Sequence, residues 1–128
     1  MTRGELAAFD DDLLQSVDTE VGADRLAALA RDHQAGIREL PGVDDIVYEW
    51  RRELPVDPVL LRSPEVYVLA LPDRVWTEFL EELGVDGREA DALRHLHDRQ
   101  GRRLLDSTDT PWPADALGSY AAMVLVRP

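Results

Sequence analysis

The chain has 128 residues, no cysteine, and 14 basic residues against 26 acidic ones, which gives a formal net charge of −12. Its length, with 45% hydrophobic and 31% charged residues, predicts a single globular domain over residues 1–128 rather than a disordered chain. The absence of cysteine excludes disulfides, thiol nucleophiles and thiolate metal sites.

Apolar residues at helical spacing predict three helices in the first 54 residues. A short helix starts near the acidic cluster 10–12, and a longer one covers residues 22–40, with Pro41-Gly42 as its stop. The apolar stripe of the longer helix consists of Leu26, Leu29, Ala30, His33, Ile37 and Leu40. The third helix covers residues 44–54, with Asp44 as its expected cap; a strand is the alternative for this segment.

Two short apolar runs follow, at residues 59–61 and 65–71. Their β-branched and aromatic content predicts strands, and Arg62-Ser63-Pro64 between them predicts a hairpin turn. The second run is almost continuously apolar, so we expect that strand to be buried on both faces.

Two more helices are predicted before the C-terminus. The first opens at Pro72-Asp73 and ends at Gly84, whose conformational freedom suits a C-terminal cap. The second runs from about residue 87 to 106 and is followed by a loop over 107–118.

The apolar segment 120–126 predicts a closing strand, most simply paired with 65–71. The fold class is therefore α+β, with a small antiparallel or mixed sheet formed by strands near 59–71 and 119–127. We expect four to five helices to pack on one face of this sheet.

The composition also indicates an environment. All 14 basic residues are arginine, and lysine and asparagine are absent, which GC-rich codons explain; they do not explain the excess of acid. In composition the chain resembles proteins of halophilic archaea, which keep molar salt in the cytoplasm, although an ordinary acidic bacterial protein is the alternative. On this interpretation the clusters Asp10–Asp12 and Asp44-Asp45 are solvated acids at helix starts, and no metal site is expected.

The three histidines give a weak catalytic signal. His95 and His97 cannot bind one ion from a helix, because positions two apart point about 200° from each other. His33 and His97 both lie on apolar helix faces, and together with a carboxylate they would form an acid–base or metal site. The preferred interpretation is two histidines at the edge of the core, each satisfied by one hydrogen bond, and no catalytic residue or cofactor is assigned.

Residues 73–104 resemble a helix-turn-helix, with Leu-Gly-Val at 83–85 as the turn. In that case the second helix presents basic side chains to DNA. The candidate DNA-contacting residues are Arg88, His95, Arg99, Arg102 and Arg103. Asp86, Glu89 and Asp91 oppose this, because they place acids at the end of the helix that approaches phosphates.

The leading functional hypothesis is a small, cytoplasmic, non-catalytic haloarchaeal protein that acts through protein–protein contacts, as a homodimer or a subunit of a larger assembly. Trp112 lies between two prolines and either caps the core, which we favour, or anchors a partner; with His33 and His97 it forms the candidate partner interface. The alternative is a helix-turn-helix or winged-helix-like DNA-binding regulator, and a third hypothesis is an enzyme built around the two histidines. No apolar run is long enough for a membrane span, and the first five residues lack the features of a signal peptide.

Overall fold

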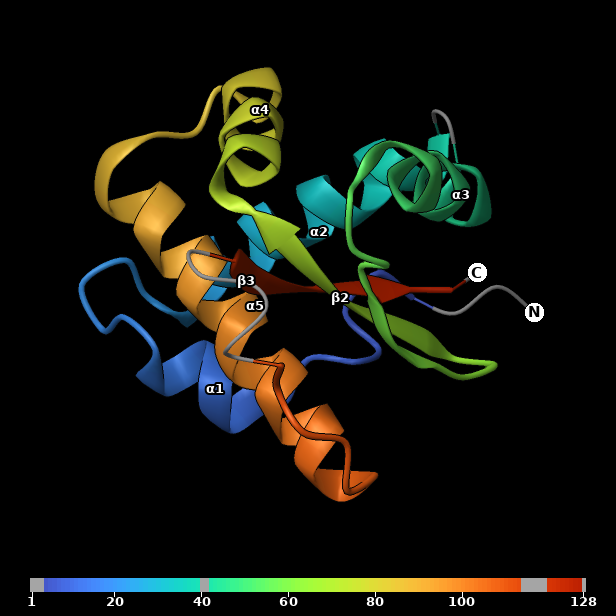
Figure 1. Ribbon diagram of the computed structural model, residues 1–128. Helices are drawn as coiled ribbons and strands as arrows, with labels where there is room; N and C mark the ends of the chain where they lie inside the picture. The colour runs from blue at the N-terminus through green and yellow to red at the C-terminus, as the bar shows by residue number, and fades with distance from the viewer. Residues whose placement is uncertain (1–3, 40–41, 114–119, 128) are drawn as a thin grey trace.

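The computed structural model describes residues 4–39, 42–113 and 120–127 and has the predicted α+β architecture (Figure 1). Three strands form one sheet: β1 (Val59–Arg62), β2 (Val66–Pro72) and β3 (Tyr120–Val126). The helices are α1 (Asp11–Ser16), α2 (Ala23–Glu39), α3 (Val43–Glu53), α4 (Asp73–Leu83) and α5 (Gly87–Ser107). These bounds agree with the predicted ones to within a few residues. Residues 40, 41 and 114–119, which belong to the predicted helix end, loop and strand start, lie outside the described residues.

The sheet has the strand order β1-β2-β3, and both pairings are antiparallel. β1 and β2 form the predicted hairpin, and β2 pairs along its whole length with β3, from Val66 opposite Val126 to Pro72 opposite Tyr120. All residues of β2 from 66 to 71 are buried, which confirms the prediction from their continuous apolar run.

Helices cover both faces of the sheet, so the expectation of a single covered face is wrong. On one face, Gly101 of α5 lies against Val68 and Ala122. On the other face, the Tyr67 hydroxyl donates to the Asp44 carboxylate of α3 at 2.7 Å. Figure 1 shows α3 and α4 on the side of the sheet opposite α1. The reason is the alternation of side chains along a strand: every second residue of an apolar strand needs cover on the opposite face.

Local sequence explains where two of the helices begin and end. Gly84 has a φ of +69°, and the amides of Gly84 and Val85 bond back to the last turn of α4, as predicted for a glycine cap. At the start of α3 the cap position is Gly42, with a φ of +104°, and not Asp44 as predicted. Asp44 lies inside the first turn, and its carboxylate accepts the hydrogen bond from the Tyr67 hydroxyl instead.

The longest helix, α5, lies across β3 and supplies much of the core. Its inner side buries Leu93, Leu96 and Leu105, while its outer side carries charged residues. None of the described helices is both long and apolar enough to cross a membrane.

Candidate functional site

The structure brings His33 of α2 and His97 of α5 together in the core. Their ring centroids are 4.8 Å apart, and the two residues are 1% and 0% exposed. Trp76 of α4 stacks on His33 and meets His97 edge-on. Both histidines are buried at the centre of the core and not at its edge, so neither lies on a surface that a partner could contact in this fold.

Each imidazole uses its Nδ1 atom as a hydrogen-bond acceptor. The Val124 N–H donates to Nδ1 of His97 at 3.0 Å. Two backbone bonds orient the amide of Gln34: its Nε2 donates to the Val124 carbonyl at 2.7 Å, and its Oε1 accepts from the Val126 N–H at 2.8 Å. The same Nε2 lies 3.3 Å from Nδ1 of His33, to which it can only donate. A neutral imidazole that accepts at Nδ1 carries its proton on Nε2, so both rings are Nε2–H tautomers.

These tautomers leave neither histidine a free lone pair. The two Nε2 atoms are buried and have no hydrogen-bond partner among the described residues. Burial lowers the pKa of His33 to about 4, and burial together with the neighbouring His33 lowers the pKa of His97 well below its usual value. A general base or a metal ligand needs an available lone pair, so this pair is not arranged for either role. Over the described ranges, no three His, Cys, Asp or Glu side chains are grouped to hold a metal ion.

One edge of β3 pairs with β2, and side chains of α2 and α5 cover the opposite edge. Gln34 satisfies the Val124 carbonyl and the Val126 amide, His97 satisfies the Val124 amide, and Asp98 accepts from the Ala122 amide at 3.3 Å. Gln34 therefore joins α2 to the sheet, a role that the sequence reasoning missed. The available signal was its position beside His33 on the apolar stripe of the helix.

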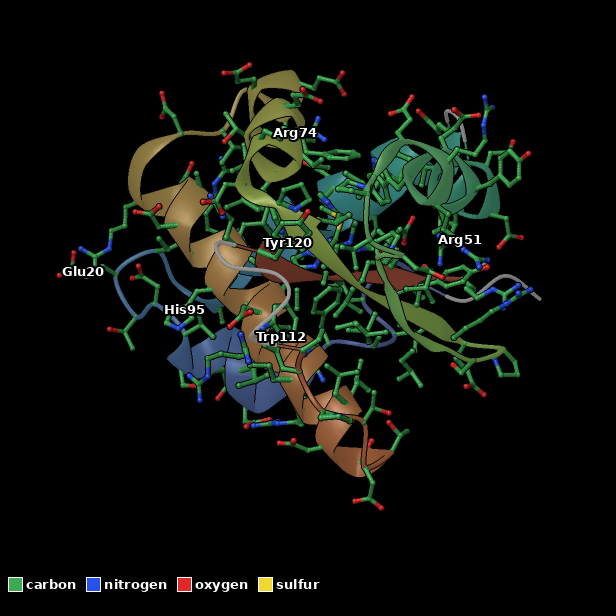
Figure 2. The ribbon with its side chains drawn as sticks, viewed as in Figure 1. Glu20, Arg51, Arg74, His95, Trp112 and Tyr120 are labelled. Carbon is green, nitrogen blue, oxygen red and sulfur yellow. The ribbon has the colours of Figure 1, made fainter. Side chains whose placement is uncertain are left out.

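Three of the five candidate DNA-contacting residues are engaged in ion pairs with the chain's own acids. The pairs are Arg88 with Asp18 and Glu20, Arg102 with Asp98, and Arg103 with Asp10 and Asp12, at 2.6 to 3.0 Å. His95 and Arg99 are exposed on the outer side of α5, where Figure 2 shows His95. The ion pairs of Arg88, Arg102 and Arg103 reduce the positive charge that could meet DNA phosphates. It also gives Asp10 and Asp12 partners other than a metal ion.

Four partly exposed apolar side chains form a surface beside β1, on the face of the sheet that α5 covers. They are Leu60, Leu61, Leu104 and Trp112, and they pack over a small buried cluster of Val68, Leu105 and Ala122. We call these four residues the Leu104 surface. Trp112 lies close to α5 (Figure 2), with the Arg102 guanidinium 4.3 Å from its ring centroid. Trp112 packs on this cluster and stays partly exposed, so its two interpretations, as a cap of the core and as an anchor for a partner, are compatible.

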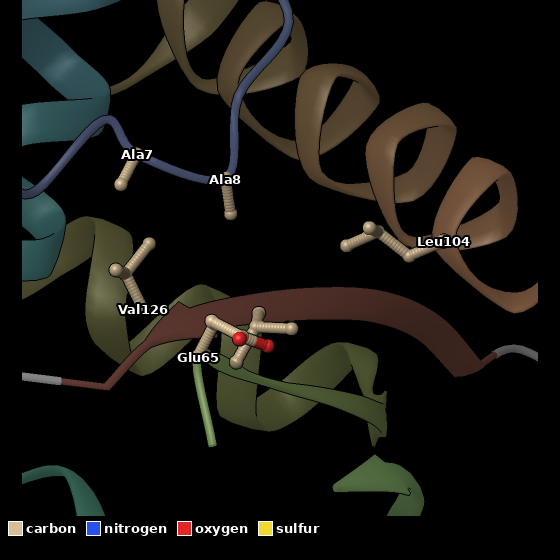
Figure 3. Close-up of a pocket in the computed structure, with 6 residues that line it drawn as sticks. Ala7, Ala8, Glu65, Leu104 and Val126 are labelled. Carbon is tan, nitrogen blue, oxygen red and sulfur yellow. The ribbon is translucent and has the colours of Figure 1, made fainter. Parts of the chain in front are cut away.

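An apolar pocket adjoins the Leu104 surface and shares Leu104 with it (Figure 3). We call it the Glu65 pocket, after the one charged residue among the described residues that line it. Its volume is about 340 Å³, and it is lined by Ala7, Ala8, Glu65, Val66, Leu104 and Val126. The lining comes from the segment before α1, the paired ends of β2 and β3, and the last turns of α5.

Comparison with known proteins identifies a family that the chain matches. No curated protein and no solved structure is significantly similar to this chain. Residues 7–127, which include every described helix and strand, match the family described as "Domain of unknown function (DUF8048)". The chain therefore belongs to this family.

Proposed function

We propose that the protein is non-catalytic and acts through protein–protein contacts made by the Leu104 surface and the adjoining Glu65 pocket. The observation that carries the proposal is the continuity of the two. Leu104 packs over the buried cluster under Leu60, Leu61 and Trp112, and it also lines the pocket. Exposed apolar patches next to hollows are typical of interaction sites.

Trp112 is suited to anchor such a contact. Tryptophan is enriched among the residues that dominate binding energy at protein interfaces. The Arg102 guanidinium on its ring, itself paired with Asp98 at 3.0 Å, orders the side chain before a partner arrives. An ordered side chain loses less conformational entropy on binding.

We further infer that the protein works in the cytoplasm of a halophilic, haloarchaeal cell. The support is the net charge of −12 and the position of the acids. Glu78, Glu81 and Glu82 on the outer side of α4 are exposed, and none of them forms an ion pair with another described residue. Such carboxylates repel one another in dilute buffer and are screened in molar salt.

The experiment that tests the contact is affinity capture from the native host in molar KCl, with three bait proteins compared. The baits are the wild type, Leu104→Glu and the control Tyr48→Ala; Tyr48 is 61% exposed on α3, on the other side of the sheet. We expect the same host proteins with the wild type and Tyr48→Ala, and their loss with Leu104→Glu. Equal capture by a folded Leu104→Glu bait would refute the proposal.

Self-association is the second form of the same proposal, and light scattering in molar KCl distinguishes it. A dimer of the wild type that Leu104→Glu converts to a monomer would identify a second copy as the partner.

The helix-turn-helix alternative has less support, because Arg88, Arg102 and Arg103 are paired with acids. A DNA mobility shift that Arg99→Glu abolishes would restore it.

A further inference from the structure

We propose that the Glu65 pocket receives a basic side chain of a partner protein, with its aliphatic stem inside the pocket and its cationic group on the Glu65 carboxylate. This inference rests on the proposed function and specifies the chemistry of the partner.

The pocket is large enough for the stem of a lysine or arginine. Its volume is about 340 Å³, whereas an apolar cavity of about 150 Å³ already admits benzene. Its lining apart from Glu65 consists of alanine, valine and leucine side chains, as suits a run of methylene groups. Figure 3 shows Ala7 and Ala8 above the pocket, Val126 and Glu65 below it, and Leu104 of α5 at one end.

The charge of the pocket selects a cation. Among the described residues that line the pocket, Glu65 alone is charged, and its exposed carboxylate accepts a hydrogen bond from the Ser63 hydroxyl at 3.2 Å. No ion pair between described residues involves Glu65, so its charge is available to a ligand. In dilute buffer the net charge of −12 also favours the approach of a cation and opposes an anion or a second copy of this acidic chain, an effect that molar salt screens.

Three six-carbon probes test the chemistry on the full chain: n-hexylammonium, n-hexanol and n-hexanoate, each titrated while the methyl NMR signals of Ala8 and Leu104 are followed. We expect n-hexylammonium to bind most tightly and n-hexanoate least. Shortening the ammonium probe by one methylene should weaken binding about four-fold. Glu65→Gln should weaken the ammonium probe roughly three-fold and leave the alcohol unchanged, because exposed ion pairs contribute little.

Peptides distinguish a side chain from a free amine. A short peptide with one lysine between two glycines should shift the same methyl signals, and its norleucine and glutamate counterparts should bind more weakly or not at all. Binding of n-hexylammonium without any effect of the lysine peptide would overturn the assignment to a partner side chain. Equal binding of the three six-carbon probes would overturn the role of Glu65.

A blocked pocket separates this inference from the proposed function. Ala8→Leu places extra methyl groups in the pocket, and its fold is checked by the NMR signals of β2 and β3. It should abolish binding of every probe. Loss of partner capture by Leu104→Glu together with no binding of any probe would leave the proposed function standing and refute the basic side chain.

Discussion

Gly101 of α5 and Ala122 of β3 are in such close contact that a Cβ atom at position 101 would lie 2.8 Å from the Cβ of Ala122. The same added atom would lie 3.3 Å from Cγ1 of Val68. Real Cβ atoms do not approach each other to 2.8 Å, so the absence of a side chain at Gly101 sets the distance between the longest helix and the sheet.

Gly101→Ala should therefore destabilise the protein, although alanine is the better helix former. We expect a loss of about 1–2 kcal/mol in the free energy of unfolding, since overpacking outweighs the gain in helix propensity. The matched control is Gly36→Ala in α2, where an added Cβ meets nothing within 4 Å. This control should gain up to about 1 kcal/mol. Denaturant unfolding at fixed KCl measures both, and equal effects of the two substitutions would contradict the role of Gly101.

Gln34 gives the second prediction. Gln34→Met keeps the length of the side chain but leaves the Val124 carbonyl and the Val126 amide without their partners. Each unsatisfied buried group costs about 1–3 kcal/mol, so we expect a loss of about 2–4 kcal/mol once the added apolar burial is counted. Gln15→Met on the exposed side of α1 is the control and should change little. A loss no larger than that of the control would mean that the edge of β3 does not depend on Gln34.

The third prediction concerns acid. The pKa of folded His33 is about 4 and that of His97 is also lowered, so between about pH 4 and pH 6.5 the unfolded chain binds more protons than the folded one. The stability that these histidines confer is complete above pH 6.5 and falls as the pH falls through this window. The expected slope is at most about 1.4 kcal/mol per pH unit for each histidine, and it is about half as large near pH 6.5.

Unfolding curves measured from pH 5 to 7 in constant KCl test this dependence. His97→Asn keeps an acceptor near the Val124 amide but removes one titrating group, so it should roughly halve the slope. His95→Asn, on the exposed side of α5, is the control for the substitution itself. A wild-type stability that is flat across this range would show that the two buried rings take up protons without unfolding.

Sequence periodicity predicted the elements well because each element buries one stripe or one run of apolar residues. The stripe of α2 and the continuous apolar run of β2 are both visible in the chain itself. The tertiary roles of polar residues were not visible in the same way. Whether Gln34 faces water or a strand edge depends on a partner 90 residues away, and the partners of Arg103 are more than 90 residues away.

The candidate site was predicted only in part, for the same reason. The apolar faces of His33 and His97 allowed the two residues to meet but did not place them together, and their tautomers depend on Val124 and Gln34, which only the fold places beside them. The Glu65 pocket has no sequence signal at all. It combines a segment before α1, the ends of two strands and the last turns of α5.

The last prediction concerns salt. Raising KCl from 0.1 M to 2 M should raise the thermal midpoint, because screening relieves the repulsion that accompanies a net charge of −12. The same screening weakens ion pairs such as Arg25–Glu89, but exposed pairs contribute only about 0–1 kcal/mol each. The repulsion is therefore expected to dominate.

A triple variant, Glu78→Gln, Glu81→Gln and Glu82→Gln, removes exposed acids of α4 and should reduce the salt dependence of the thermal midpoint. Arg31→Gln is a control of opposite sign, since it removes an exposed positive charge from α2 and should increase that dependence. A thermal midpoint that does not respond to KCl would refute the halophilic interpretation, and the acids of α3 and α4 would then need another role.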